Sequence, residues 1–143
     1  MNVLFALCAA GITVDRYSNR LSIFNLIEQI VSPGFPAWLP EVTFLVVLRR
    51  ENNEAGQFQA RAEIRVGDNA IGAPTQVAVD FEGGNTARQI MNFQGIPVPA
   101  PGELTFRLFL PDNQVATVTI PVTRAGANVV APAQPVVAPQ DNQ

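Results

Sequence analysis

The chain has 143 residues, of which 48% are hydrophobic and only 15% are charged, whereas an ordinary soluble domain carries about 25% charged residues. This length suits one folded domain with a sizeable core, and the apolar composition excludes a chain that is disordered over most of its length. The nine basic residues are all arginine, and lysine and histidine are absent. This removes the usual general base, the imidazole metal ligand and the Schiff-base amine. With a net charge of −3 and no basic stripe, we expect a non-enzymatic protein with no cofactor and no nucleic-acid partner.

The first element is expected in the apolar run Val3–Ala10. A signal peptide would need a basic region before this run and a small-residue cleavage site after it, and the chain has neither, so a buried strand is favoured. No apolar run approaches the roughly 20 residues of a transmembrane helix, so we expect no membrane partner. Cys8 is the only cysteine and has no neighbouring base, so we expect a small buried side chain in a reducing compartment. We therefore predict a cytoplasmic location, with a virion as the alternative.

Two-residue alternation of apolar and polar side chains predicts most of the strands. Ser22–Val31 is apolar on both sides and also fits helical spacing, but its β-branched content favours a strand. Val42–Leu48 is almost continuously apolar, which is typical of a central strand covered on both faces or of a strand whose outer face meets a partner. The clearest alternation runs from Gln57 to Gly67 and places Arg61, Glu63 and Arg65 on the solvent face as a local charge balance. The remaining strands are expected at residues 77–81, 86–93, 104–110 and 116–122.

Turn-forming Asn, Asp, Gly and Pro residues separate these runs. About eight short strands with such turns indicate an all-β fold, a single antiparallel β-sandwich of immunoglobulin-like or C2-like type. We expect the sandwich domain to span residues 1–124. The remainder, Ala125–Gln143, is an extended or disordered tail rich in Pro, Ala and Val, with Val-Val-Ala-Pro at Val129–Pro132 and again at Val136–Pro139.

If the strands run alternately up and down, the loops gather at two chemically different ends. One end is acidic and holds residues 15–19, 51–56, 82–85 and 112–113. Calcium requires six to eight oxygen ligands, several of them carboxylates, and no loop here has an Asp-x-Asp cluster, so we expect ordinary turns and no metal. Asp80 and Glu82 share an outward strand face, where solvated charges are favoured over acid–base catalysis.

The other end is rich in proline and holds residues 32–40, 68–74 and 97–102. We expect Phe35 and Trp38 to fold back and close the open end of the core, and a contact surface is the alternative. In the tail, Pro132-Ala133-Gln134-Pro135 has PxxP spacing, and the repeats either dock along an apolar groove or sheet edge or remain disordered. The candidate partner-binding residues at this end and in the tail are Phe35, Trp38, Leu39, Val129, Val130, Pro132, Pro135, Val136 and Val137.

Two motifs resemble a bacterial family of small β-sandwich proteins that is known only as a domain of unknown function. They are the segment from Asn19 to Ile30 (NRLSIFNLIEQI) and the segment from Pro101 to Leu108 (PGELTFRL). The resemblance spans most of Val3–Arg124 and implies a sandwich of bacterial or phage-borne origin, with no functional residue to carry over. We therefore predict a protein–protein interaction or scaffold module. A structural component of a larger assembly, such as a phage accessory or decoration protein, is the first alternative, and a loop-based calcium or ligand binder is the second.

Overall fold

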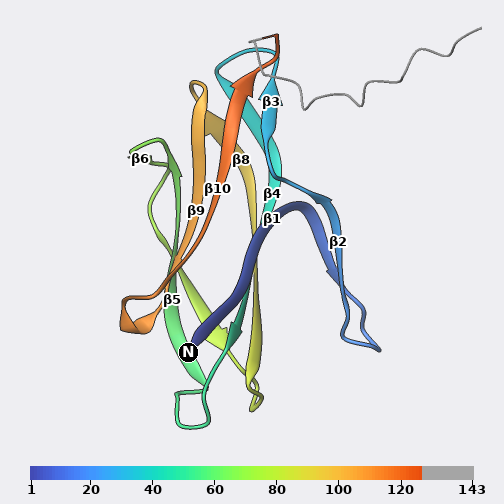
Figure 1. Ribbon diagram of the computed structural model, residues 1–143, viewed down its shortest axis with the longest axis vertical. Helices are drawn as coiled ribbons and strands as arrows, with labels where there is room; N and C mark the ends of the chain where they lie inside the picture. The colour runs from blue at the N-terminus through green and yellow to red at the C-terminus, as the bar shows by residue number, and fades with distance from the viewer. Residues whose placement is uncertain (127–143) are drawn as a thin grey trace, which may run out of the picture.

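The computed structural model describes residues 1–126, and these form two β-sheets packed face to face (Figure 1). Sheet A has the strand order β2 (Leu21–Leu26), β1 (Asn2–Val14), β4 (Ala37–Arg49) and β8 (Thr86–Val98). Sheet B has the order β3 (Ile30–Ser32), β10 (Val115–Arg124), β9 (Gly102–Phe109), β5 (Gln57–Val66) and β6 (Asn69–Ala70), and β7 (Thr75–Asp80) also pairs with β5. The 3-10 turn η1 (Pro111–Asn113) links β9 to β10. The predicted all-β class is confirmed.

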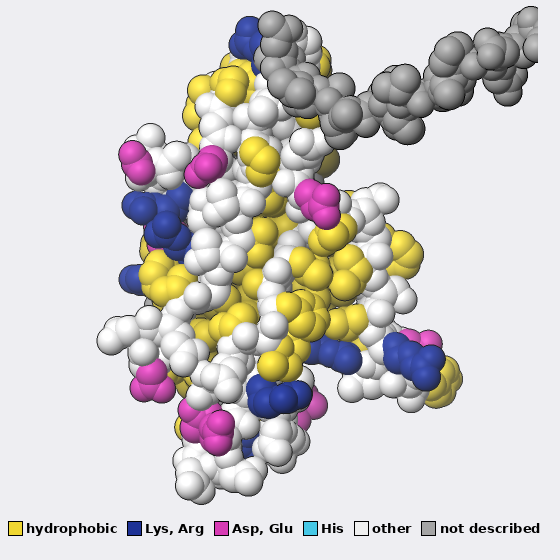
Figure 2. Space-filling view, in the orientation of Figure 1, with side chains coloured by type: hydrophobic (Ala, Val, Ile, Leu, Met, Phe, Trp, Pro, Cys, Tyr) yellow, Lys and Arg dark blue, Asp and Glu magenta, His cyan; other side chains and the backbone are white. Residues whose placement is uncertain are grey.

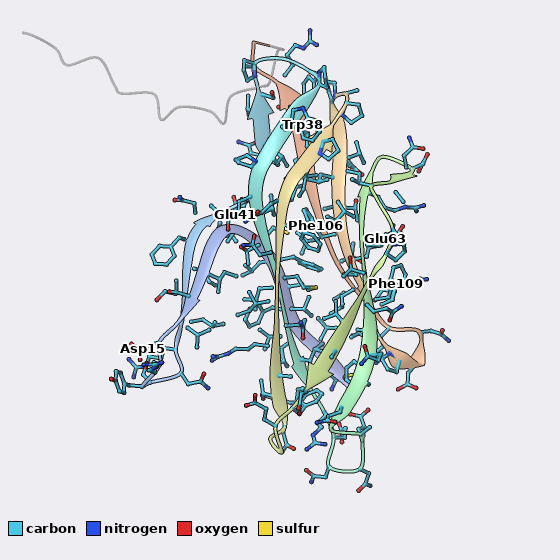
Figure 3. All side chains as sticks on the ribbon, turned by 180° about the vertical axis from the view of Figure 1, so that it is seen from behind. Asp15, Trp38, Glu41, Glu63, Phe106 and Phe109 are labelled. Atoms are coloured by element: carbon cyan, nitrogen blue, oxygen red, sulfur yellow. The ribbon has the colours of Figure 1, made fainter. Side chains whose placement is uncertain are left out.

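The core lies between the two sheets and contains the side chains that the alternation pointed inward. Phe106 of β9 packs against Phe44 of β4 and Phe93 of β8, with ring centroids 5.7 and 5.8 Å apart, and Figure 3 shows it between the sheets. Burying one side chain of this size contributes about 1.5–3 kcal/mol. Cys8 is fully buried in the same cluster, as expected.

Strand β4 is covered on both faces. Every residue from Val42 to Leu48 is buried, but only every second one belongs to the core between the sheets. Leu45 and Val47 point to the opposite, outer face of sheet A and are still 0% and 5% exposed. The prediction of a central strand covered on both sides is therefore confirmed.

The prediction of one strand over Ser22–Val31 is wrong. The segment forms two strands in different sheets, β2 in sheet A and β3 in sheet B. Asn25 has a φ of 52°, a left-handed conformation that a regular strand does not contain, and the Ile27 N–H donates to the Cys8 carbonyl at 2.8 Å. The chain then crosses between the sheets, and β3 pairs in parallel with β10.

The β1–β2 hairpin leaves the body of sheet A, and we call residues 10–26 the hairpin arm. Strand β1 pairs with β4 only from Asn2 to Ala9, and from Ala9 onward it pairs with β2. Figure 1 shows the arm bending away from β4, with its turn at residues 15–19 far from the N-terminus. That predicted turn is confirmed, because Asp15 Oδ1 accepts the N–H groups of Tyr17 and Ser18, both at 2.8 Å.

Strands β4 and β8 both shift their alternation by one residue at the same level. In β4, Leu39 and Val42 both pack on the core although two exposed residues, Pro40 and Glu41, separate them. In β8 the exposed pair is Gln94–Gly95, and Glu41 lies opposite Gln94. Between the start of β4 at Ala37 and this shift, the outer face carries a residue that strict alternation would have placed in the core.

Candidate functional site

The outer face of sheet B is polar and charged. Arg65 forms an ion pair with Glu63 at 3.0 Å, and the Arg61 guanidinium lies over the Phe109 ring, 4.5 Å from its centroid. Figure 3 shows Glu63 and Phe109 on this side of the molecule. Charge balance between Glu63 and Arg65 was expected, whereas the stacking of Arg61 on Phe109 was not. This face has the composition of a solvated surface.

The outer face of sheet A is apolar over β1 and the middle of β4, whereas Arg88, Asn92 and Gln94 make most of the β8 side polar. Its cross-strand neighbours are Phe5 with Val47, and Leu45 with both Leu7 and Ile90. Leu45 and Val47 are buried, while Phe5 is 45% exposed. These five residues form what we call the sheet A surface, and Figure 2 shows hydrophobic side chains gathered between β1 and the hairpin arm.

The hairpin arm extends this apolar surface. Leu26 lies opposite Ala9 and Phe24 lies opposite Gly11, and both side chains are 52% exposed. Val14 and Ile23 are also exposed. None of these residues was predicted as a contact residue. For Ile23, Phe24 and Leu26 the signal was present in the two-sided apolar pattern of Ser22–Val31, which was interpreted only as a strand.

A cleft of about 340 Å³ separates the tip of the arm from β8, with Val14, Asn19, Arg88 and Ile90 in its wall. Arg88 bridges it by donating from Nη1 to the Asn19 carbonyl at 2.6 Å. The arm is therefore tethered at its tip although β1 leaves β4 after Ala9.

At the proline-rich end, the structure separates the two aromatic residues that were expected to close the core. Phe35 is half-buried against the core, with the Arg124 guanidinium 5.8 Å from its ring centroid. The expectation that this residue folds back onto the core is therefore confirmed. Leu39 also packs on the core. Trp38 does not, because it lies in β4 rather than in a loop and is 68% exposed. The shift at Pro40–Glu41 accounts for this, since it turns Trp38 outward, opposite Pro97 (Figure 3).

The same end contains an apolar groove of about 540 Å³ between the β5–β6 and β8–β9 turns. Val66 and Ile71 line one wall, and Pro97, Pro99 and Pro101 line the other. Both Val66 and Ile71 pack on the core, so the groove opens outward from the hydrophobic interior. The predicted grouping of residues 68–74 with 97–102 is thus confirmed.

The acidic end is organised by an arginine. Arg50 donates from Nε to the Gly84 carbonyl at 2.8 Å and from Nη1 to the Glu54 carbonyl at 3.1 Å, joining two of the predicted loops. The carboxylate of Glu54 accepts from the Met1 amino group and from the Glu51 N–H. Contact with the amino group and this N–H holds the pKa of Glu54 below its ordinary value. Within residues 1–126, no group of three or more Asp, Glu, Cys or His residues is placed to hold a metal ion.

Asp80, which was weighed as an acid–base residue, has a structural role. Asp80 accepts from the Gln57 side chain at 2.9 Å and from the Glu82 N–H at 2.7 Å, so its carboxylate stabilises the turn that follows. The candidate tail residues Val129, Val130, Pro132, Pro135, Val136 and Val137 lie outside the described residues.

In the described part of the chain, no helix has the length and apolar character needed to cross a membrane. Neither a curated protein nor a solved structure matches the chain. A model of a family of unknown function, DUF6941, matches residues 4–123, which is nearly the whole two-sheet domain from β1 to β10. The chain therefore belongs to the DUF6941 family.

Proposed function

We propose that this protein is a non-enzymatic interaction module that binds another protein through the sheet A surface, the hairpin arm and Trp38. The observation that carries the proposal is the contrast between the two outer faces. The outer face of sheet B carries the charged residues Glu63, Arg65 and Arg61, whereas the hairpin arm and β1 expose large hydrophobic side chains. Contiguous exposed apolar patches on soluble proteins mark interaction sites.

The composition of this surface supports a protein partner. Aromatic side chains dominate binding hot spots because they bury a large area at low entropic cost. Phe5, Phe24 and Trp38 are all more than 40% exposed. Val47 lies opposite Phe5, and both Val47 and its outer-face neighbour Leu45 are already buried. A partner would therefore cover a surface whose centre is desolvated before binding.

A second candidate function, a structural component of a larger assembly such as a phage accessory protein, is favoured by the hairpin arm. The arm projects from the body (Figure 1) and carries exposed hydrophobic residues at Val14, Ile23, Phe24 and Leu26. Such an arm can dock on a neighbouring subunit. In this case the location would be a virion rather than the cytoplasm.

The remaining expectations about context form part of the same proposal. They are a bacterial or phage-borne origin, a reducing compartment and a single sandwich domain over residues 1–124 of immunoglobulin-like or C2-like type. The unpaired, fully buried Cys8 supports a reducing compartment, and the core shared by two sheets supports the sandwich.

The test compares Phe24→Ser and Trp38→Ala with Val115→Ser. Val115 is a matched control because it lies in sheet B and is 42% exposed. Light scattering at several protein concentrations measures self-association, and quantitative capture from the native host measures binding of another protein. We expect each test variant to weaken the association by about 30-fold, since loss of a hot-spot side chain costs about 2 kcal/mol, and the control to behave as the unmodified protein. A strict monomer that captures no protein, or an equal loss in the control, would contradict the proposal.

Calorimetric titration with calcium separates the remaining rival, a loop-based metal binder. The interaction module is expected to produce no binding heat. A saturable heat that Glu54→Gln or Asp112→Asn abolishes would favour the rival instead.

A further inference from the structure

The groove at the proline-rich end has the properties of a peptide-binding site. Its volume of about 540 Å³ lies in the range of ligand sites, which are concave and mostly apolar. Val66, Ile71 and three prolines supply apolar contacts, and Asp68 is the one charged residue among its lining residues in the described chain. The site therefore suits an uncharged, apolar segment.

The proline wall determines how such a segment can bind. Pro97, Pro99 and Pro101 occupy alternate positions and have no N–H to donate, so this wall cannot form a continuous ladder with an added strand. Recognition must rest on side-chain packing, as in grooves that accept polyproline II segments. A segment that combines valine with proline satisfies both conditions.

The chain itself supplies a segment of this kind beyond the last described residue. Residues 127–143 contain Val-Val-Ala-Pro twice, and no charged residue occurs between Gly126 and Asp141. The chain leaves β10 on the same end of the molecule, because Val122 of β10 lies opposite Gly102, which lines the groove. Immediately afterwards it turns, with the Ala125 N–H donating to Ser32 and Gly126 at a φ of 82°.

The geometry distinguishes between the two repeats. From β10 the sheet order is β9, β5 and β6, so the far wall of the groove at β6 is about 14 Å away at about 4.8 Å per strand. An extended chain advances about 3.1 Å per residue, so from Gly126 the first repeat would span about 9 to 19 Å and the second would begin at about 31 Å. Because the Ala125 N–H is bonded to Ser32 of β3, on the other side of β10 from β9, the chain must turn back before it crosses β9 and β5. The first repeat would be used up in that path, whereas the second repeat has chain left to turn into the groove.

We propose that the groove is a peptide-binding site whose occupant is the second repeat, Val136–Pro139, of the same molecule. A tether of this length gives an effective concentration in the millimolar range, which favours the attached segment over that of another copy. The site is distinct from the sheet A surface, so either proposal can fail without the other. A partner with a similar Val- and Pro-containing segment would have to displace the chain's own segment.

The experiment uses the full chain and compares Val136→Ser/Val137→Ser with Val129→Ser/Val130→Ser. The two double variants are matched because they remove the same side chains from identical four-residue repeats. Methyl NMR of Ile71 and Val66 is the readout. We expect the second-repeat variant to shift these signals and the first-repeat variant to leave them unchanged.

The occupant is then tested from the side of the groove. An Ile71→Asp variant, checked for folding by circular dichroism, should abolish the difference between the two repeat variants. Unchanged Ile71 and Val66 signals in both repeat variants, or equal shifts in both, would overturn the proposal. Signals that change with protein concentration would show that a second copy fills the groove and would overturn the assignment to the same molecule. If the repeat variants show no docking in the groove while Phe24→Ser still weakens partner capture, the peptide-binding proposal is rejected and the proposed function is not affected.

Discussion

Arg88 on β8 reaches the backbone of Asn19 at the tip of the hairpin arm, where its Nη1 donates to the carbonyl oxygen at 2.6 Å. The two residues are 69 positions apart in the chain. Their contact tethers the hairpin arm to β8 at a point where β1 no longer pairs with β4. The same guanidinium lies 3.3 Å from Asn19 Oδ1. Arg88 of sheet A therefore helps to fix the position of the exposed apolar residues of the arm.

Replacing Arg88 with methionine should loosen the arm without unfolding the core. Methionine retains an apolar stem but cannot donate to Asn19, and loss of one exposed hydrogen bond of this kind costs about 1 kcal/mol. We expect amide exchange over residues 12–24 to accelerate about fivefold, as measured by hydrogen exchange and mass spectrometry. Arg107→Met on sheet B is the control and should leave arm exchange unchanged. Equal exchange in Arg88→Met and the unmodified protein would mean that the tether does not hold the arm.

Substituting Gly95 with alanine should destabilise the fold through the backbone alone. Gly95 has a φ of 65°, yet a Cβ at this position would meet nothing within 4 Å. The cost is therefore the left-handed penalty of about 1–2 kcal/mol, visible as a lower urea midpoint. Gly11→Ala is matched, because its site is equally open and its φ is not left-handed, and it should not destabilise. If the two variants lose equal stability, the conformation of Gly95 is not the reason.

The thiol of Cys8 should be unreactive in the folded protein and should make stability depend on alkaline pH. Burial raises the pKa of Cys8 from 9.0 to about 12. The pKa of the Cys8 thiol is higher in the folded than in the unfolded protein, so burial of the neutral thiol makes its full contribution to the free energy of unfolding below pH 9. That contribution is lost as the pH rises from about 9 towards 12. Urea unfolding at increasing pH should show this loss, and Cys8→Ala should reduce it. Rapid labelling of the native thiol at pH 8 would contradict the burial.

The turn at the tip of the arm should weaken in acid. The backbone N–H of Ser18, followed by that of Tyr17, lowers the pKa of Asp15. A lowered folded pKa means that the contribution is present above the unfolded value of about 3.9 and is lost as the pH falls through the folded value. An NMR titration should place the Asp15 carboxyl midpoint below its midpoint in urea, and Asp15→Ala should remove the acid dependence of Tyr17 and Ser18 amide exchange. Identical midpoints in the two states would exclude these hydrogen bonds in solution.

Much of the fold followed from the sequence where one strand face meets the core and the other meets water. In β5, β9 and β10 the alternation predicted the buried face correctly, because most of the outward residues are polar or charged. The candidate site was less predictable. Trp38 is an even number of residues from Val42 and Phe44, so simple alternation would place its side chain in the core with theirs. The shift that exposes Trp38 requires matching irregularities in β4 and β8.

The apolar segment Ser22–Val31 shows the same limit. Its residues favour extended backbone but contain no information about which sheet each half joins, and the crossing at Ile27 depends on a hydrogen bond to Cys8, far away in the chain. The exposed side chains of Phe24 and Leu26 follow from this division, since β2 has sheet A on one edge only. Local preference therefore could not identify them as surface residues.

By itself, the amino-acid order determined that the chain would build layered strands around an apolar interior, that Cys8 would be enclosed and that the reactive residue types for common catalysis were scarce. Only the tertiary structure decided which apolar residues stay in contact with water, where the arm leaves the sheet and which turns enclose the groove. The physical reason is that alternation specifies two faces for each strand, whereas the cover on each face comes from segments distant in the chain, whose arrangement no local pattern encodes.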